Sequence, residues 1–283
     1  MTGEEAQLGR LRGAVDARLA ALLPQPGSAP LLLGAAMRHA VLAPGKRLRP
    51  ILTLLAVRCL DGDERAALDP ACAVEMVHAA SLVLDDLPCM DDAPLRRGLP
   101  STHVRFGEDV AVLAAVALLN QAYGIIARSP GVPEAARLAM VAAVTDAVGV
   151  TGLVGGQEDD LHAPEADSLA ALSDVHHRKT GVLFMAAVEL GARSAGADGR
   201  IVEVLKRFAA ELGLAFQALD DLDDGAEDEA QAAAAAGSVL AFLGKDGARR
   251  EAGRRLDAAK AALSDGDGRL EPIGRYVDLI LRP

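Results

Sequence analysis

Two clusters of aspartates, far apart in the chain, carry residues that could do chemistry together. The first aspartate motif reads Asp85-Asp86-Leu87-Pro88-Cys89-Met90-Asp91-Asp92, and the second reads Asp220-Asp221-Leu222-Asp223-Asp224. Carboxylates packed this closely repel one another unless a cation lies between them. Mg²⁺ is usually held by a few carboxylates together with waters and substrate phosphates. Two such motifs that face each other would hold a phosphorylated substrate through magnesium.

The spacing of the second motif favours a shared binding rim. On a helix, Asp220 and Asp224 lie one turn apart on the same face, with Asp221 beside them. A solvated acidic helix end is the alternative, but negative charge at a helix C-terminus opposes the helix dipole. An EF-hand calcium loop is excluded, because Leu222 and Gln231 would occupy the third and twelfth ligand positions.

Basic residues follow the first motif and also form a turn earlier in the chain. Arg96 and Arg97 would either pair with the nearby carboxylates or bind phosphate, for which the planar guanidinium is well suited. The turn Gly45-Lys46-Arg47-Leu48-Arg49-Pro50 is either a phosphate clamp or an ordinary basic loop. It is not a P-loop, since the GxxxxGK[ST] spacing is absent from it.

One histidine and one lysine have positions that suggest a role at the same site. His78 precedes Asp85 by seven residues, which places both on nearly the same helical face. Lys179 lies in a basic stretch next to a glycine. The remaining histidines are interpreted as ordinary surface or core residues: His39, His103, His162, His176 and His177.

The composition predicts that helices position these residues. Of the 283 residues, 51% are hydrophobic but only 2% are aromatic, and none is tryptophan. Alanine and leucine must therefore form the core, which favours helices, and no strand-like alternation is apparent. We expect one all-α domain over residues 1–283, a large bundle of about ten helices. Asp69-Pro70 is expected to begin the helix that runs to Asp85, and Ser168 or Ser173 to cap the helix that carries Lys179.

Charge and cysteine content exclude some classes of protein. The 29 basic and 40 acidic residues give a net charge of −11, which argues against nucleic-acid binding. Three cysteines (Cys59, Cys72 and Cys89) fit a reduced cytosol better than a disulfide framework. The acidic N-terminus lacks the features of a signal peptide. Val110–Ala127 approaches membrane length, but its polar interruptions favour a buried helix in a cytoplasmic protein without an integral membrane segment.

The ordered set of motifs resembles the short-chain trans-prenyl diphosphate synthases, the family of farnesyl and geranylgeranyl diphosphate synthases, from about Leu31 to Gly244. Each motif alone is weak, whereas the complete series in this order is highly specific. The stretches that carry the resemblance are Gly45-Lys46-x-x-Arg49-Pro50, Glu75-Met76-x-His78-x-x-Ser81-Leu82, the first aspartate motif with its longer bacterial-type spacing, Arg96-Arg97-Gly98, Gly155-Gly156-Gln157, Lys179-Thr180-Gly181 and Phe216-Gln217-x-x-Asp220-Asp221-x-x-Asp224.

The resemblance implies an isoprenoid-synthase bundle with a central active-site cavity and a role for each matching residue. The implied Mg²⁺ ligands are Asp85, Asp86, Asp91, Asp220, Asp221 and Asp224. Arg96 and Lys179 would contact the allylic diphosphate, and Lys46, Arg49, His78 and Arg97 would bind isopentenyl diphosphate. Thr180, Phe216 and Gln217 would line the place where the carbocation forms. Metal ions and cations would then stabilise the departing diphosphate, while a dry pocket protects the cation from water.

The resemblance also bears on product length. A bulky residue five positions before the first aspartate stops chain growth in the family, and here that position is Ala80, followed by Ser81. The open position predicts a twenty-carbon product, geranylgeranyl diphosphate, over the fifteen-carbon farnesyl alternative. Leu113, Val116 and Ala117 are expected to form the cavity floor.

The sequence departs from the family pattern at three places. The lysines usual after the second motif are missing from Glu227–Gly237, and Lys245 comes too late to replace them. Leu84 stands where histidine is frequent, and Ala93-Pro94 and Leu99 replace charged residues around Arg96-Arg97. Loss of one phosphate-binding cation would weaken allylic binding by roughly 1.5–3 kcal/mol.

Two rival functions follow from these departures and from the fold. A non-catalytic partner subunit would fit the missing lysines, but the retained motif carboxylates argue against it. A terpene cyclase on the same fold would replace the second aspartate motif with a mixed set and would use aromatic rings to stabilise cations. The favoured reading is a magnesium-dependent prenyltransferase, expected to be a homodimer as its family is.

Overall fold

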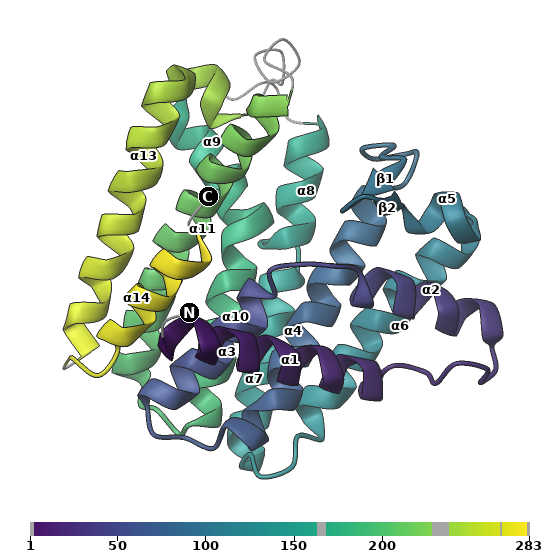
Figure 1. The fold of residues 1–283 in the computed structure, drawn as a ribbon, viewed down its shortest axis with the longest axis horizontal. Helices are drawn as coiled ribbons and strands as arrows, with labels where there is room; N and C mark the ends of the chain where they lie inside the picture. Colours follow the sequence, from purple (N-terminus) through teal and green to yellow (C-terminus); the bar gives the residue numbers. More distant parts are fainter. Residues whose placement is uncertain (1–2, 163–167, 228–237, 267, 282–283) are drawn as a thin grey trace.

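The computed structural model of the protein describes residues 3–162, 168–266 except 228–237, and 268–281 (Figure 1). Thirteen α-helices occur in these segments, which confirms the all-α prediction. They are α1 (Gly3–Leu22), α2 (Leu31–Leu42), α3 (Leu48–Cys59), α4 (Glu64–Asp85), α5 (Thr102–Phe106), α6 (Glu108–Ala127), α7 (Glu134–Val148), α8 (Leu153–His162), α9 (Leu169–His176), α10 (Val182–Ser194), α11 (Gly199–Glu227), α13 (Val239–Leu263) and α14 (Glu271–Ile280). The prediction of one domain over residues 1–283 remains a prediction.

Shorter elements connect some of these helices. A π-helical turn, His177–Gly181, joins α9 to α10, and a 3₁₀ turn, Ser264–Gly266, follows α13. Strands β1 (Leu95–Arg96) and β2 (Leu99–Pro100) form a small antiparallel hairpin after α4. This hairpin was not predicted, because two-residue strands are too short to show alternation.

The helices pack around a central group formed by α3, α4, α10 and α11 (Figure 1). Helix α1 lies across this group and contacts α3 and α4, while α13 packs along α11. Small side chains allow this close packing. The Cβ of an alanine at Gly191 of α10 would come within 2.4 Å of the Thr53 carbonyl oxygen of α3. An alanine-rich core thus brings helix backbones near one another instead of filling the space with rings.

Helix α4 begins earlier than the sequence predicted. Its N-cap is Asp63, whose side chain accepts a hydrogen bond from the Arg65 amide, and Pro70 lies inside the helix. The prediction of a start at Asp69-Pro70 was therefore wrong. The additional turns bury Ala66 and Ala67 in the core, which offsets the backbone hydrogen bond that Pro70 cannot donate.

Of the two capping residues predicted, Ser168 and Ser173, the structure has Ser168 at the start of a helix. Ser168 caps α9 by accepting a hydrogen bond from the Ala171 amide at 3.2 Å. Helix α9 ends at His176, however, so Lys179 lies in the π-helical turn that follows it.

The uncharged stretch Val110–Ala127 forms most of α6, but only one of its faces is buried. Ala114, Leu118 and Ala122 lie in the core, whereas Leu113 and Val116 are 57% and 59% exposed. The prediction of a buried helix therefore holds for one face of α6 and not for the other. Three helical stretches are long and apolar enough to cross a membrane by length and composition: Glu64–Asp85, Glu108–Ala127 and Glu134–His162. The first of them is mostly buried inside the fold.

Candidate active site

A cavity of about 680 Å³ opens between the start of α3, the second half of α4, the π-helical turn and α11. Most of the residues singled out in the sequence line it. They are Lys46, Arg49, His78, Ser81, Asp85, Asp91, Arg96, Arg97, Lys179, Thr180, Phe216, Gln217 and Asp220. The fold therefore brings together motifs from opposite ends of the chain in one polar chamber.

The first aspartate motif ends α4 and turns two carboxylates towards the cavity. Asp85 and Asp91 both line it, and the Asp91 amide donates a hydrogen bond to the Asp85 carbonyl at 2.9 Å. Burial raises the pKa of Asp85 to about 6; Asp91 adds to this rise and Lys179 opposes it. An anionic pair held in this way favours a cation beside it.

Asp86 lies in a different place from its neighbour. Its side chain is buried and accepts hydrogen bonds from the Nε and Nη2 of Arg96, at 2.9 and 2.6 Å. Asp86 does not line the cavity, so in this arrangement it orients Arg96, which does. Its expected role as a direct metal ligand remains a prediction.

The second motif presents Asp220 to the same cavity from α11. Asp221 accepts hydrogen bonds from the Gln217 side chain at 3.0 Å and from the Val239 amide at 2.7 Å. Gln217 in turn accepts one from the Thr180 hydroxyl at 3.1 Å. This chain of bonds joins the π-helical turn, α11 and the start of α13. The Asp224 side chain and residues 228–237, where the expected lysines are missing, lie outside the described part of the structure.

The chemistry of these donors fits Mg²⁺. Asp85, Asp91 and Asp220 offer only oxygen, the ligand that Mg²⁺ prefers. In the described segments no three acidic, cysteine or histidine side chains form a metal-binding group by themselves. Mg²⁺ at phosphate sites is commonly held by one or two carboxylates that share it with substrate phosphates. Each aspartate motif could supply the one or two carboxylates that such a magnesium ion needs.

The opposite part of the cavity is cationic. Lys46, Arg49 and Arg97 line it together with His78. Arg97 approaches the backbone of the basic turn so closely that a Cβ at Gly45 would lie 2.6 Å from its Nη1. Gly45 thus leaves room for the Arg97 guanidinium at this point of the turn.

The surroundings of Arg49 and His78 lower the pKa of both side chains. The Arg49 guanidinium lies 4.4 Å from the centre of the Phe184 ring, and burial lowers its pKa to about 10. Burial, followed by the charges of Arg49 and Arg97, lowers the pKa of His78 well below its usual value. His78 is thus neutral at pH 7, and its Nε2 lies 3.4 Å from the Arg97 Nη2.

Two ion pairs fix the π-helical turn against α8, and neither was predicted from the sequence. Lys179 bonds to Asp160 at 2.6 Å, and Arg178 bonds to Asp159. A Cβ at Gly156 would lie 2.7 Å from the Lys179 amide nitrogen, so this glycine allows α8 to reach the turn. The acidic residues that directly follow the Gly155-Gly156-Gln157 motif were the available signal. π-Helical turns frequently occur at functional sites.

The residues expected to set product length occupy different environments. Ser81 lines the cavity, whereas Ala80 is completely buried in the core. Leu113 and Val116 lie on the exposed face of α6 and do not line the cavity of the single chain, so their assignment to its floor was wrong. Ala117 is only partly buried against the core. Helical spacing alone could not tell which face of α6 points inward.

Comparisons with known proteins agree with this geometry. The family model for polyprenyl synthetase matches residues 30–238. A geranylgeranyl diphosphate synthase of Pantoea ananas is 49% identical over 217 residues, covering 76% of this chain and 72% of that protein. Another, of Pseudescherichia vulneris, is 44% identical, covering 90% of this chain and 84% of that protein.

Solved structures lead to the same family. The crystal structure of a protein of Zymomonas mobilis, described as an FPP/GFPP synthase, superposes with a TM-score of 0.85 at 35% sequence identity. The match covers 96% of this chain and 98% of that one. The resemblance carried by the ordered motifs is thereby confirmed over most of the chain, together with the isoprenoid-synthase fold. The chain belongs to the polyprenyl synthetase family and is an enzyme of the prenyltransferase type.

Proposed function

We propose that the protein adds isopentenyl diphosphate to an allylic diphosphate and releases geranylgeranyl diphosphate. The observation that carries this proposal is one cavity lined by aspartates of both motifs and by a separate group of cations that includes Lys46, Arg49 and Arg97. Such a cavity suits two diphosphates, one bound through metal and one bound directly by the protein. The names of the Pantoea ananas and Pseudescherichia vulneris relatives support the twenty-carbon product.

In this proposal the allylic diphosphate lies between the two aspartate motifs. Asp85, Asp91 and Asp220 hold the Mg²⁺ ions, with Asp86, Asp221 and Asp224 as the further members of the set. Bound magnesium supplies positive charge for the departing diphosphate. Arg96 and Lys179 contribute direct charge-assisted hydrogen bonds to it. Both side chains are paired with carboxylates, at 2.6 Å to Asp86 and to Asp160, which fixes them in advance.

Isopentenyl diphosphate occupies the cationic part of the cavity. Lys46, Arg49 and Arg97 bind its diphosphate, and neutral His78 offers a hydrogen bond without a charge. As the allylic C–O bond breaks, a C–C bond forms between the allylic carbon and the isopentenyl double bond, and one proton is lost. The departing diphosphate is a plausible acceptor for that proton. Thr180, Phe216 and Gln217 line this reaction volume, where Phe216 helps to exclude water.

The proposal includes three expectations about the molecule as a whole. We expect a homodimer, a cytoplasmic location and no integral membrane segment. The homodimer is supported by apolar side chains of α6, such as Leu113 and Val116, that the single chain leaves exposed. Nucleic acid is not an expected partner, given the net charge of −11.

The test is product analysis. Purified protein is incubated with Mg²⁺, isopentenyl diphosphate and each allylic diphosphate in turn, and the products are identified by mass spectrometry. The expected product is a twenty-carbon diphosphate. A fifteen-carbon product would overturn the chain-length assignment and favour a farnesyl diphosphate synthase. Folded protein that elongates no starter would overturn the proposed reaction and favour the partner-subunit alternative.

A further inference from the structure

At the cationic part of the cavity, two lining residues form a buried ion pair that the proposed mechanism does not use. Arg47, at the start of α3, bonds through its Nη1 to the Glu75 carboxylate of α4 at 2.9 Å. Both side chains are only 4% exposed. Removing one partner of such a pair leaves an uncompensated buried charge, so the two residues depend strongly on each other.

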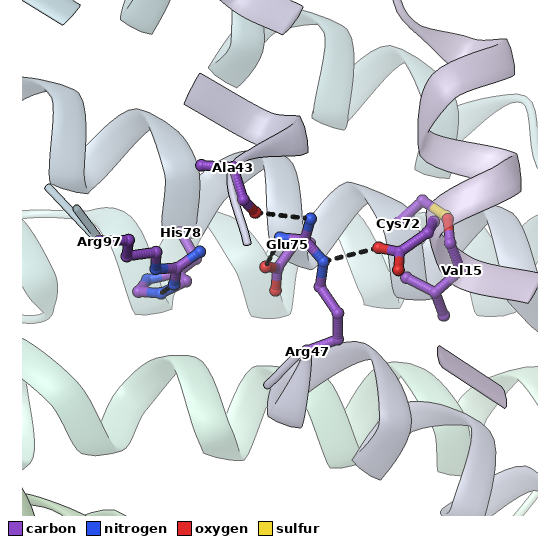
Figure 2. Close-up of polar contacts among 8 residues, drawn as sticks. Val15, Ala43, Arg47, Cys72, Glu75, His78 and Arg97 are labelled. Atoms are coloured by element: carbon purple, nitrogen blue, oxygen red, sulfur yellow. Dashed lines mark hydrogen bonds and ion pairs between the residues drawn. The ribbon is translucent and has the colours of Figure 1, made fainter. Parts of the chain in front are cut away.

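Arg47 reaches three separate parts of the fold. Its Nε bonds to Asp16 of α1 at 2.8 Å, and its Nη2 donates to the Ala43 carbonyl at 2.9 Å, in addition to the bond with Glu75 (Figure 2). One planar guanidinium thus joins α1, the loop before α3, and α4. Lysine has a single ammonium and no planar fork, so it cannot reproduce this geometry.

The backbone of Arg47 has an unusual conformation. Its φ is 53° and its ψ is 37°, in the left-handed region that residues with a side chain rarely adopt. Such a conformation persists only where surrounding contacts fix it. The three bonds of the guanidinium provide that fixation. Lys46 and Arg49, which are expected to bind isopentenyl diphosphate, lie one residue before and two residues after this corner.

Glu75 is the acidic group associated with all three arginines of this region. Its charge acts on Arg47, Arg49 and Arg97, and in each case it favours the charged guanidinium. One helical turn further along α4, His78 contacts Arg97 (Figure 2). The cations that would bind a diphosphate are therefore held beside one fixed carboxylate.

We propose that Arg47 and Glu75 are a positioning pair for the isopentenyl diphosphate site, with neither residue acting as a substrate ligand. The pair locks the left-handed corner at Arg47 and thereby sets the places of Lys46 and Arg49. It also keeps Arg49 and Arg97 close together without a bound anion. This inference rests on the proposed function, because it names the substrate whose site the pair organises.

The experiment compares Arg47→Lys and Glu75→Gln with Arg18→Lys as a matched control. Arg18 also joins α1 to α4, through bonds of 2.6 and 2.9 Å to Asp69, but it does not line the cavity. We expect each of the first two variants to raise the KM for isopentenyl diphosphate about tenfold, since a charged hydrogen bond contributes roughly that factor or more. The KM for the allylic substrate should change less than about twofold, within the usual error of additivity between separate sites. Arg18→Lys should leave both KM values unchanged even where it lowers the melting temperature.

A double variant tests whether the two residues act through each other. Arg47→Lys combined with Glu75→Gln should raise the KM for isopentenyl diphosphate no further than the stronger single change. Should either variant fail to fold, Asp16→Asn provides a milder loss, because Asp16 is 47% exposed and is only one of three partners. It should raise the same KM about two- to fivefold, in line with the smaller contribution of an exposed partner.

Several outcomes would overturn the inference. An unchanged or lower KM for isopentenyl diphosphate in Glu75→Gln, beside a raised KM in Arg47→Lys, would make Arg47 a direct substrate ligand. Equal effects on both substrates would make the pair merely structural. Calorimetric titration with isopentenyl diphosphate separates these results from a failure of the proposed function. If the wild-type protein does not bind this compound, the proposed function fails; if it binds and the variants bind equally well, only the positioning role fails.

Discussion

Asp85 shows how the proposed catalytic arrangement opposes stability. The folded pKa of about 6 exceeds the ordinary value of 3.8, so folding disfavours the ionised carboxylate. Stability therefore falls as the pH rises from 3.8, and the loss is complete above about pH 6. Asp85→Asn should therefore raise the unfolding free energy in the presence of a chelator at pH 7.5, by at most about 3 kcal/mol. The same change should lower kcat by about a thousandfold or more, because a metal ion contributes several kcal/mol to charge stabilisation.

Chemical denaturation and a steady-state assay measure the two effects of Asp85→Asn. Asp92→Asn is the control, since Asp92 is exposed and does not line the cavity. It should change neither quantity. Turnover at the wild-type rate in Asp85→Asn would refute the assignment of Asp85 as a metal ligand. Asp220→Ala should lose turnover for the same reason as Asp85→Asn.

His78 predicts a dependence of stability on pH. In the folded protein it stays neutral well below its usual pKa, whereas in the unfolded chain it protonates near pH 6.5. The unfolded state therefore binds more protons, and the stability due to neutral His78 is complete above pH 6.5 and declines as the pH falls below it.

Urea unfolding between pH 5.5 and 7.5 tests this dependence. His78→Gln should show a shallower decline of the unfolding free energy than the wild type. His162→Gln changes an exposed histidine of α8 and should keep the wild-type slope. Identical slopes in all three proteins would mean that His78 does not remain neutral in the fold.

At the scale of the element, α4 explains why part of the site could be predicted. His78, Ser81 and Asp85 lie three and four residues apart, so one face of the helix turns all three towards the cavity. This spacing can be recognised in the sequence, so the shared orientation of the three side chains could be predicted. Ala80, which precedes Ser81, points about 100° away from this face and lies in the core.

Two substitutions on α4 should both shorten the product, but they should differ in how much they lower the stability of the fold. Ser81→Phe adds bulk directly to the cavity and should shift the product towards fifteen carbons with little loss of stability. Ala80→Tyr should also shorten the product, but it places a ring in a closed core and should cost about 1–3 kcal/mol or more. Product chromatography and thermal unfolding measure both effects. A longer product from either variant, or none shorter, would show that the substituted position of α4 does not limit chain growth.

The elements that could not be predicted depend on contacts between distant segments. The π-helical turn is held by Asp159 and Asp160 of α8, and the corner at Arg47 is held by Asp16 and Glu75. Helical periodicity describes one segment at a time and contains no information about such pairs. The motif resemblance pointed to many residues that line the cavity, but it did not indicate which neighbouring charges orient them.

At the scale of the whole molecule, α6 presents an apolar face that the single chain does not cover. Val112, Leu113 and Val116 are 41%, 57% and 59% exposed and lie on neighbouring positions of one helical face. Burying a leucine or valine side chain contributes about 1.5–3 kcal/mol, so leaving several exposed on one helix is unfavourable for a monomer in water. The expected homodimer would cover this face with a second copy.

Leu113→Lys combined with Val116→Lys should therefore convert the dimer to a monomer. Burying two lysines without partners costs more than the lost apolar contact, because charged groups must lose their hydration. Sedimentation velocity at micromolar concentration measures the change. Phe242→Lys is the matched control: Phe242 is 40% exposed on α13, at the opposite edge of the molecule from α6 (Figure 1), and its substitution should leave the dimer intact. A dimer that survives both lysines on α6 would place the interface on another face, and a wild-type monomer would refute the expected assembly.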